Sequence, residues 1–513
     1  MADEKVDIKK LLAELDILDK EIVLHNGISG ILQWDQSTHM PKAASELRSK
    51  QLSYMQLKSH EMITSPRLVF IVSELKKKEN YAKLDKLNQR KIYLYDRKIS
   101  YNLKLPKKHV EEMAELESKL YTLWVESKKK DSFKSVIPLL SRMFELKRQE
   151  AKYIDPKKKP YDVFLDNHEE GTNMAMVDKI FSELRDELIK ILNKITKSKD
   201  YAKINSDSLI KLGKFDEDNQ WKVCEDLCKR ILHYADKYDL TKTPHPFMSS
   251  ASIDDCRVTS AIREDPMFSF GSTAHECGHA VFAMNHGKQL DGSILGGPEV
   301  GLALHESQSR LWENIICNGE YFWKGYYPYY QSLFSPLKNV PLERFYKIIN
   351  TVQPSLIRIE SDELTYCLHI IIRYELEKGL IEGSIKVENL DKEWNKKYKE
   401  YLGIIPDKPS RGVLQDVHWY SGLVGYFHTY ALGNILSATI YNAALKQNPK
   451  LNDQISKLQF DDFRNWLIKN IYVHGSSKST EEIIRNACGK YYDINDYANY
   501  LKNKYYNLYN VKE

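Results

Sequence analysis

The stretch "STAHECGHAVFA" at residues 272–283 holds two histidines, His275 and His279, that stand four residues apart. Four residues are about one helical turn, so a helix would place both imidazoles on one face, where they can bind one metal ion. Glu276 directly follows the first histidine, where its carboxylate can accept a proton from water. The surrounding residues are apolar, and polar groups inside a buried helix are costly unless something pairs them. The stretch therefore predicts a buried helix that carries a metal site.

The spacing is the H-E-x-x-H arrangement of zinc peptidases, in which the glutamate acts as general base. The alternative is a chance match among 15 histidines, and the apolar flanks argue against it. Ser272 or Thr273 is predicted to cap the start of the helix, and Gly287 is predicted to end it.

A catalytic zinc needs a third protein ligand and an open position. The segment "GGPEVGLALHESQSRLWEN" at residues 296–314 supplies three candidates, Glu299, Glu306 and Glu313. Pro298 suits the first position of a second helix, which would carry these glutamates downstream of the histidines. Spacing alone does not choose among the three.

The rest of the chain indicates a mainly α fold. Only 22 glycines and 17 prolines occur in 513 residues, and no linker rich in these residues divides the chain, which favours one helical body. Turn residues flank the opening stretch and predict a small β-sheet near residues 245–270 and 290–300. Apolar residues recur at helical spacing over 8–22, 107–153, 175–196, 217–237, 355–380 and 434–447.

Composition excludes several classes of protein. The net charge of +5 comes from 76 basic and 71 acidic side chains, so nucleic-acid binding is not expected. The amino-terminal stretch at residues 1–16 has no apolar segment, and no run of about 18 apolar residues predicts a membrane span. We expect a cytoplasmic protein without membrane contact, with its seven scattered cysteines as free thiols.

Several further motifs give the chain a specific resemblance. From "LQWDQSTHMP" at residues 32–41 to "YLKNKYY" at residues 500–506, it resembles the Taq-type family of metallocarboxypeptidases. The family's zinc helix and its H-E-S-Q-S-R segment are matched at residues 275–279 and 305–310. Three more family motifs are matched by Asp255, Arg257 and Thr259, by Ile357, Arg358 and Asp362, and by Gly412, Gln415, Asp416, His418 and Trp419.

The resemblance selects Glu306 as the third metal ligand. It implies one zinc or cobalt ion per chain, a homodimer, and peptide substrates with a free carboxyl terminus. It also implies one domain over residues 1–513 with a deep groove, covered by an amino-terminal helical part of about residues 1–200, and a catalytic part of about residues 201–513. The sequence departs from the family pattern at Ser361, where the motif has alanine, and at Tyr472, where histidine is expected.

Peptide hydrolysis also needs donors for the developing oxyanion. His418 and Tyr430 stand twelve residues apart, a spacing that related helical zinc peptidases use for a pair facing the reacting carbonyl. Tyr426 is a further substrate-binding candidate, with a core or groove-lining position as the alternative. His428, in the same segment, is expected to be a core residue.

Recognition of a free carboxylate favours arginine, whose planar fork can bind two oxygens. Arg358 is the first candidate, and Asp362 stands four residues later, where it could orient the guanidinium or form a plain helical salt bridge. Arg257 is the second candidate. The predicted function is a zinc-dependent carboxypeptidase that removes single terminal residues.

Two rival functions are kept. One is a helical zinc endopeptidase, and the other is a catalytically silent, metal-stabilised binding protein. Glu276 argues against the silent protein, because a purely structural zinc is closed by four ligands and needs no general base.

Overall fold

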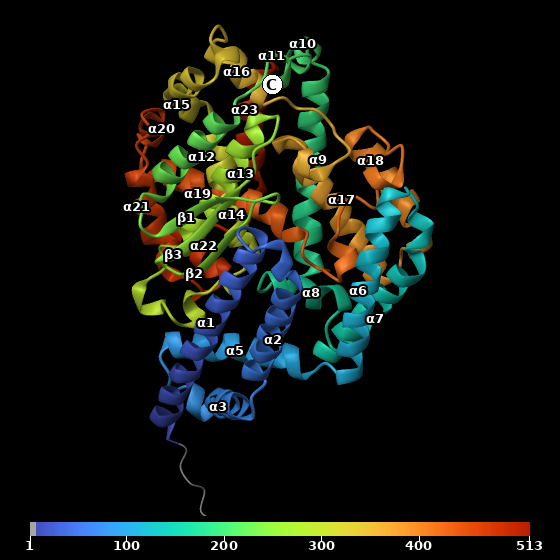
Figure 1. The fold of residues 1–513 in the computed structure, drawn as a ribbon, viewed down its shortest axis with the longest axis vertical. Coiled ribbons are helices and arrows are strands. Elements are labelled where there is room, and N and C mark those ends of the chain that lie inside the picture. The colour runs from blue at the N-terminus through green and yellow to red at the C-terminus, as the bar shows by residue number, and fades with distance from the viewer. Residues whose placement is uncertain (1–6, 513) are drawn as a thin grey trace, which may run out of the picture.

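The chain folds into a mainly helical body, as the sequence predicts (Figure 1). The computed structural model describes residues 7–512; residues 1–6, which begin the charged amino-terminal stretch, and residue 513 lie outside the described part. The helices of the first part are α1 (Ile8–Ser37), α2 (Ser45–Ile63), α3 (Pro66–Lys76), α4 (Lys78–Tyr81), α5 (Lys86–Leu103), α6 (Lys107–Lys129), α7 (Ile137–Ile154), α8 (Pro160–His168), α9 (Met174–Thr196), α10 (Tyr201–Asn205), α11 (Leu209–Leu212) and α12 (Glu217–Leu232).

A small sheet follows α12 and leads into the helices that carry the predicted site. Its strands are β1 (Tyr238–Lys242), β2 (Met248–Ser252) and β3 (Asp255–Ser260). The later helices are α13 (Pro266–Ala283), α14 (Leu302–Arg310), α15 (Glu320–Leu333), α16 (Leu342–Ile349), α17 (Glu363–Glu382), α18 (Leu390–Leu402), α19 (His428–Gln447), α20 (Leu451–Ser456), α21 (Asp461–Asn470), α22 (Thr480–Cys488) and α23 (Ile494–Leu508).

The sheet has the order β1-β3-β2, with β3 parallel to β1 and antiparallel to β2. It confirms the sheet expected near 245–270, where β2 and β3 lie, although the chain is helical from Pro266 onward. It does not confirm the strands expected near 290–300. Residues 288–290 and 294–296 form short 3₁₀ turns instead, the second begun by Ser293, whose hydroxyl accepts the backbone N–H of Leu295. A segment this rich in glycine and serine has little side chain to pack on a sheet.

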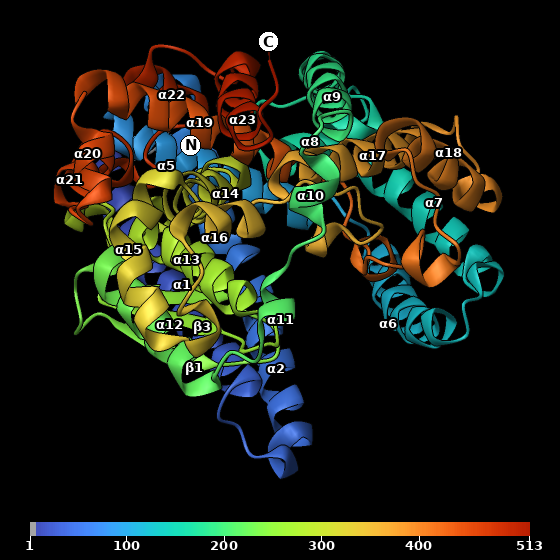
Figure 2. The same ribbon diagram turned by 90° about the horizontal axis from the view of Figure 1, so that it is seen from above.

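Buried apolar side chains form two clusters. The larger one extends from α6 to the carboxyl-terminal helices and surrounds α13, α14, α17 and α19. The smaller one joins α1, α3 and α5 to Leu290, Ile294 and Leu295. Figure 2 shows α6, α7 and α18 on one side of the molecule and α12, α13, α20 and α21 on the other, with α2 at the bottom of the view. The seven cysteines are free, as predicted, and six of them are buried.

Several helix boundaries differ from the predictions. The predicted metal-binding helix begins at Pro266, six residues before Ser272, because Asp265 caps it by accepting the backbone N–H of Met267. The next helix begins at Leu302, so Pro298 lies in the preceding loop. Of the segments predicted to be helical, 355–380 is helical only from Glu363, and 217–237 only as far as Leu232. The segment 107–153 forms two helices, α6 and α7, with a break between them.

Within the described residues, none of the helices combines the length and the apolar character needed to cross a membrane.

Candidate metal centre and substrate groove

The helices α13 and α14 touch backbone to backbone at Gly278. A β-carbon at this position would lie 2.5 Å from the carbonyl oxygen of Gln308 and 2.6 Å from the α-carbon of Ser309. Such distances are impossible for any side chain, so only glycine allows this approach. The contact brings the histidines of one helix to the glutamates of the other.

Three ligand atoms converge where the helices meet. Nε2 of His275 lies 3.8 Å from Oε2 of Glu306, and Nε2 of His279 lies 3.6 Å from the same oxygen. One ligand atom from each residue falls within 4.8 Å of the others. The structure therefore brings together the three residues that the sequence predicts as metal ligands.

The outer nitrogens of both histidines are held by partners that the sequence analysis did not assign. Nδ1 of His275 donates to Oε2 of Glu313 at 2.8 Å, and Nδ1 of His279 lies 2.7 Å from Nδ1 of His305. These contacts leave both Nε2 atoms facing the centre, as in metal-binding histidines. Glu299, another candidate, instead pairs with Lys98.

Charge at the centre favours a cation. Arg310 donates from Nε to Glu306 at 2.9 Å and from Nη1 to Glu313 at 3.2 Å. Burial lowers the pKa of His275, but the carboxylates of Glu306 and Glu313 outweigh burial and raise it to about 9. Two imidazole nitrogens, a carboxylate and this excess of negative charge fit a divalent ion such as zinc.

Glu276 lies beside these ligands and has an unusual acidity. Its side chain is buried, with 8% of the residue exposed. Burial raises its pKa to about 7, and Glu306 and Glu313 act in the same direction against His275 and Arg310. A carboxylate with a pKa near neutrality can both take up and release a proton at physiological pH.

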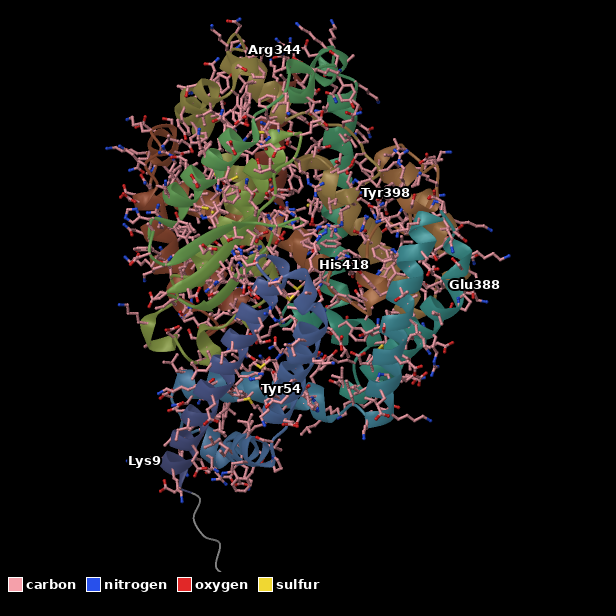
Figure 3. All side chains as sticks on the ribbon, viewed as in Figure 1. Lys9, Tyr54, Arg344, Glu388, Tyr398 and His418 are labelled. Carbon is pink, nitrogen blue, oxygen red and sulfur yellow. The ribbon has the colours of Figure 1, made fainter. Side chains whose placement is uncertain are left out.

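An aromatic segment lies at the centre of the molecule, where Figure 3 labels His418. The rings of His418 and Tyr426 are 6.0 Å apart, and those of Tyr426 and Tyr430 are 5.1 Å apart. Burial lowers the pKa of His418 to about 4, so its ring is neutral at pH 7. His428 is fully buried beside Thr172, as expected for a core residue.

Arg358 is held by an acid other than the one predicted. Its Nε and Nη2 atoms donate to Oδ1 of Asp416 at 3.1 and 3.0 Å. Asp362 instead caps α17, where it accepts the backbone N–H and the hydroxyl of Thr365. The predicted Arg358–Asp362 pair is wrong because residues 358–360 form a separate 3₁₀ turn, and α17 begins only after Asp362.

Asp416 also binds a second, fully buried arginine. Nε of Arg373 donates to Oδ2 of Asp416 at 2.5 Å. Burial would raise the pKa of Asp416, but the two guanidinium groups hold it well below its usual range. Tyr366 links this group to the metal centre, because its hydroxyl accepts from Arg358 at 3.3 Å while Arg310 lies 4.4 Å from its ring centre. Arg358 is thus rigidly oriented beside the metal-binding helices.

A family model described as Carboxypeptidase Taq (M32) metallopeptidase matches residues 14–505. The chain belongs to this family. Carboxypeptidase 1 of Bacillus subtilis is 33% identical over 494 residues, which cover 96% of this chain and 97% of that protein. Thermostable carboxypeptidase 1 of Pyrococcus furiosus is 31% identical over 500 residues, covering 97% and 98% of the two chains. The predicted resemblance is confirmed.

Solved structures of the family have the same fold. The M32 carboxypeptidase from Deinococcus radiodurans R1 superposes with a TM-score of 0.93 at 31% identity, covering 98% of this chain and 100% of the other. Trypanosoma cruzi metallocarboxypeptidase 1 gives a TM-score of 0.92 at 28% identity, covering 97% and 100%. Membership of the Taq family makes the chain a metallocarboxypeptidase, a peptide hydrolase that acts at carboxyl termini.

The Taq-family motif around Arg257 lies on β3. Arg257 donates to Oδ1 of Asp255 at 2.9 Å and stacks on the ring of Trp34 in α1, 4.3 Å from the ring centre. Neither partner belongs to the group around Arg358 and Asp416. At the two departures from the family pattern, Ser361 donates to the carbonyl of Arg358, and Tyr472 packs against Phe282 of α13.

The amino terminus of α14 is held by a buried glutamate from the end of α8. Oε2 of Glu169 accepts the backbone N–H of Ala303 at 2.8 Å. At Gly301, where φ is +130°, a β-carbon would lie 2.6 Å from both carboxylate oxygens. Burial raises the pKa of Glu169 to about 8. Glu169 therefore helps to fix the helix that carries Glu306.

Proposed function

We propose that the chain is a zinc-dependent exopeptidase that removes single residues from the carboxyl terminus of peptides, with broad specificity among them. The observation that carries the proposal is the convergence of His275, His279 and Glu306, with both outer imidazole nitrogens held. One zinc or cobalt ion per chain fits these three ligands. When bound, the ion supplies a Lewis acid that polarises the peptide carbonyl and the attacking water.

Glu276 acts as the general base. Its carboxylate takes a proton from the attacking water and then gives it to the nitrogen of the departing residue. Its raised pKa supports both steps, because the group is partly protonated near neutral pH.

Three side chains are proposed to position the substrate beside this base. His418 and Tyr430 donate hydrogen bonds to the oxygen of the reacting carbonyl. Tyr426, whose ring lies beside both of theirs, contacts the substrate from the same aromatic segment. The neutral state of His418 supports its role as a hydrogen-bond donor without a charge.

Arg358 binds the free terminal carboxylate. Asp416 and Tyr366 fix its guanidinium, so little side-chain entropy is lost on binding. Arg257 is the second candidate for this role, and its stacking on Trp34 would orient it in a similar way.

Digestion of peptides with free and with amidated carboxyl termini, followed by mass detection, tests the function. A carboxypeptidase produces a ladder of products shortened one residue at a time, from free termini. Internal fragments from both peptides would instead favour the endopeptidase, and no products from either would favour the silent binding protein.

We also propose one domain with two parts, as the resemblance implies. The separate apolar cluster of α1, α3 and α5 supports an amino-terminal part, and the stacking of Trp34 on Arg257 connects it to the catalytic part. The near balance of charge supports a cytoplasmic enzyme that binds neither nucleic acid nor membranes.

A homodimer is proposed from an exposed apolar surface on α1 and α2. On α1, Ile17, Leu24 and Ile28 are 59%, 67% and 54% exposed and fall on one helical face. On α2, Leu47 and Tyr54 are more than half exposed and stand seven residues apart. Large apolar side chains gathered in this way favour an interface with a second copy.

A further inference from the structure

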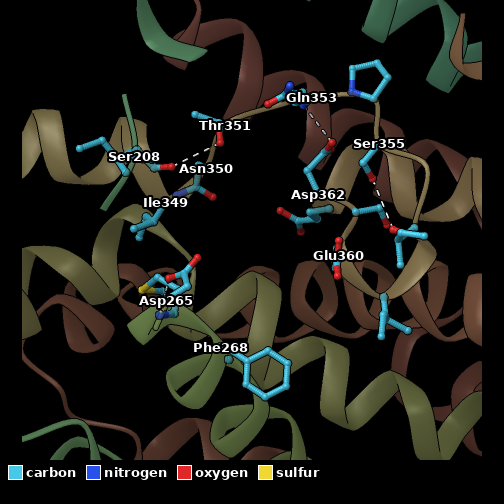
Figure 4. Close-up of a pocket in the computed structure, with 18 of the residues that line it drawn as sticks. Ser208, Asp265, Phe268, Ile349, Asn350, Thr351, Gln353, Ser355, Glu360 and Asp362 are labelled. Carbon is cyan, nitrogen blue, oxygen red and sulfur yellow. Dashed lines mark hydrogen bonds between the residues drawn. The ribbon is translucent and has the colours of Figure 1, made fainter. Parts of the chain in front are cut away.

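A cavity of about 1350 Å³ opens beside the candidate metal centre (Figure 4). Its wall includes Glu313, which accepts from His275, and Gly271, one turn before His275 on α13. It also includes residues on both sides of Arg358, among them Ile357 and Glu360. The cavity therefore adjoins both the metal-binding residues and the segment that carries the proposed carboxylate-binding arginine.

Carboxylates dominate the charge of the cavity wall. Eight acidic side chains line it, against two arginines, Arg263 and Arg411. Four of the acids have a cationic partner, in the pairs Asp207–Arg344, Glu313–Arg310, Glu363–Lys504 and Asp407–Arg411.

The other four acids leave the wall negatively charged. Asp265 and Asp362 accept backbone N–H groups at the starts of α13 and α17. Glu264 and Glu360 are exposed at the cavity, and neither forms an ion pair within residues 7–512. Arg263 is the remaining cation, and its guanidinium lies over the ring of Phe268, 4.1 Å from the ring centre. The balance of charge favours a cationic occupant.

An unpaired acceptor at the same wall points independently to a hydrogen-bond donor. Asn350 follows α16 and is only 2% exposed, and its amide nitrogen donates to the carbonyl of Tyr346. Its side-chain oxygen has no hydrogen-bond partner among the described residues. Figure 4 shows Asn350 at the cavity wall, with this oxygen directed to the cavity side. A buried acceptor without a partner is costly unless a ligand supplies a donor.

We propose that this cavity receives the ammonium or guanidinium group of the residue that is released, so that the enzyme prefers peptides ending in lysine or arginine. The inference rests on the proposed function. If Arg358 holds the terminal carboxylate of the peptide, the side chain of the peptide's last residue lies next to the segment that lines the cavity. Glu264 and Glu360 supply the attracting charge, and Asn350 accepts a hydrogen bond.

The experiment compares peptides that differ only in the last residue, which is lysine, norleucine or glutamate. Norleucine has nearly the length of lysine without its charge. All peptides are acetylated at the amino terminus, because a free α-ammonium group is another cation that the cavity could attract. We expect kcat/KM for lysine to exceed that for norleucine by about tenfold, with glutamate the poorest, and the ratio to fall with added salt.

The double variant Glu264→Gln with Glu360→Gln tests the residues. It should reduce the lysine-to-norleucine ratio to about two or less, because the attracting charge is lost while side-chain size is kept. The matched control is Glu343→Gln on α16, an exposed glutamate outside the cavity, which should leave the ratio unchanged.

Two outcomes would overturn the inference: equal rates for lysine and norleucine, or an unchanged ratio in the double variant. Failure of the unmodified enzyme to shorten any of the peptides would instead contradict the proposed function. The two failures are therefore distinguishable.

Discussion

Glu313 holds His275 without belonging to the converging ligand set: its Oε2 lies 2.8 Å from Nδ1 of His275, on the side of the ring away from Glu306. A residue in this position orients a ligand and strengthens its basicity, and its loss typically weakens metal binding by about 10–100-fold. Glu306 would contact the ion itself.

We therefore expect Glu306→Ala to lose bound metal more completely than Glu313→Ala. Glu313→Gln should retain more metal than Glu313→Ala, because its amide oxygen can still accept the hydrogen of Nδ1. Elemental analysis after dialysis against a chelator measures how much metal each variant retains. Greater metal loss from Glu313→Ala than from Glu306→Ala would show that the ligand was assigned to the wrong glutamate.

Glu276→Gln should keep the metal and the fold but lose turnover. The amide has the size of the carboxylate but cannot accept a proton, and removal of a general base typically costs about 10²–10⁴-fold in rate. The measurements are kcat on a free-terminus peptide and metal content on the same sample. A variant with a near-normal rate would contradict the assigned mechanism.

Arg358→Ala should raise KM by about 10–100-fold, because a charge-assisted hydrogen bond to the terminal carboxylate is lost in both the bound and the reacting state. Arg358→Lys should recover only part of this loss, since lysine lacks the two-pronged geometry. Steady-state kinetics on one peptide with a free terminus compares the three proteins.

Amidated peptides supply the control for Arg358. Amidation should impair the unmodified enzyme strongly and add little to the defect of Arg358→Ala. If amidation impairs both proteins equally, the carboxylate is bound elsewhere, and Arg257 becomes the residue to test.

Glu169 should make stability depend on pH. Burial raises its folded pKa to about 8 from 4.5, so the neutral form stabilises the fold fully below pH 4.5, and this contribution is lost as pH rises through 8. Glu169→Gln removes the titration and can still accept the N–H of Ala303. Relative to this variant, the unmodified enzyme should lose up to about 4 kcal/mol between pH 5 and 8.

Melting temperatures at several pH values test this prediction. The difference between Glu169→Gln and the unmodified enzyme should grow as pH rises from 5 to 8. Glu183→Gln, at an exposed position of α9, is the control and should show a constant difference. A constant difference for Glu169→Gln as well would mean that Glu169 is ionised throughout this range in the folded protein.

The double variant Leu24→Glu with Ile28→Glu should convert a dimer to a monomer, because two charges cannot be buried unpaired against a second copy. Sedimentation equilibrium gives the mass. Tyr321→Glu changes an exposed apolar residue of α15, a helix labelled near the top of Figure 1 and away from α1, and should remain dimeric. A monomeric unmodified enzyme would exclude the proposed dimer directly.

Local spacing was sufficient to predict one side of the metal centre. His275 and His279 share a helical face because four residues make a turn. The apolar residues around them are buried as predicted, while the two histidines themselves are half-buried. The choice of Glu306 needed the family motif, because three glutamates in the same segment had compatible spacing. The small sheet near residue 250 also followed from the dense turn residues around it.

Contacts between distant segments could not be predicted in this way. Arg358 stands four residues from Asp362, but its carboxylate partner Asp416 is 58 residues away. Asp416 itself belongs to a motif identified in the sequence, although its function as an acceptor for two arginines depends on how α17 packs. His305 directly precedes Glu306, and its contact with His279 depends on the crossing of two helices, which spacing within one helix does not determine.

The close approach at Gly278 has a consequence for how the enzyme acquires its metal. Because main chain rests on main chain there, the separation of the ligand-bearing helices is set by the packed backbone and not by the ion. The ligand-bearing helices are then already ordered before the ion binds, so little conformational entropy is lost when it binds. We therefore expect the metal to bind to a preformed site, and not to a segment that folds around the ion.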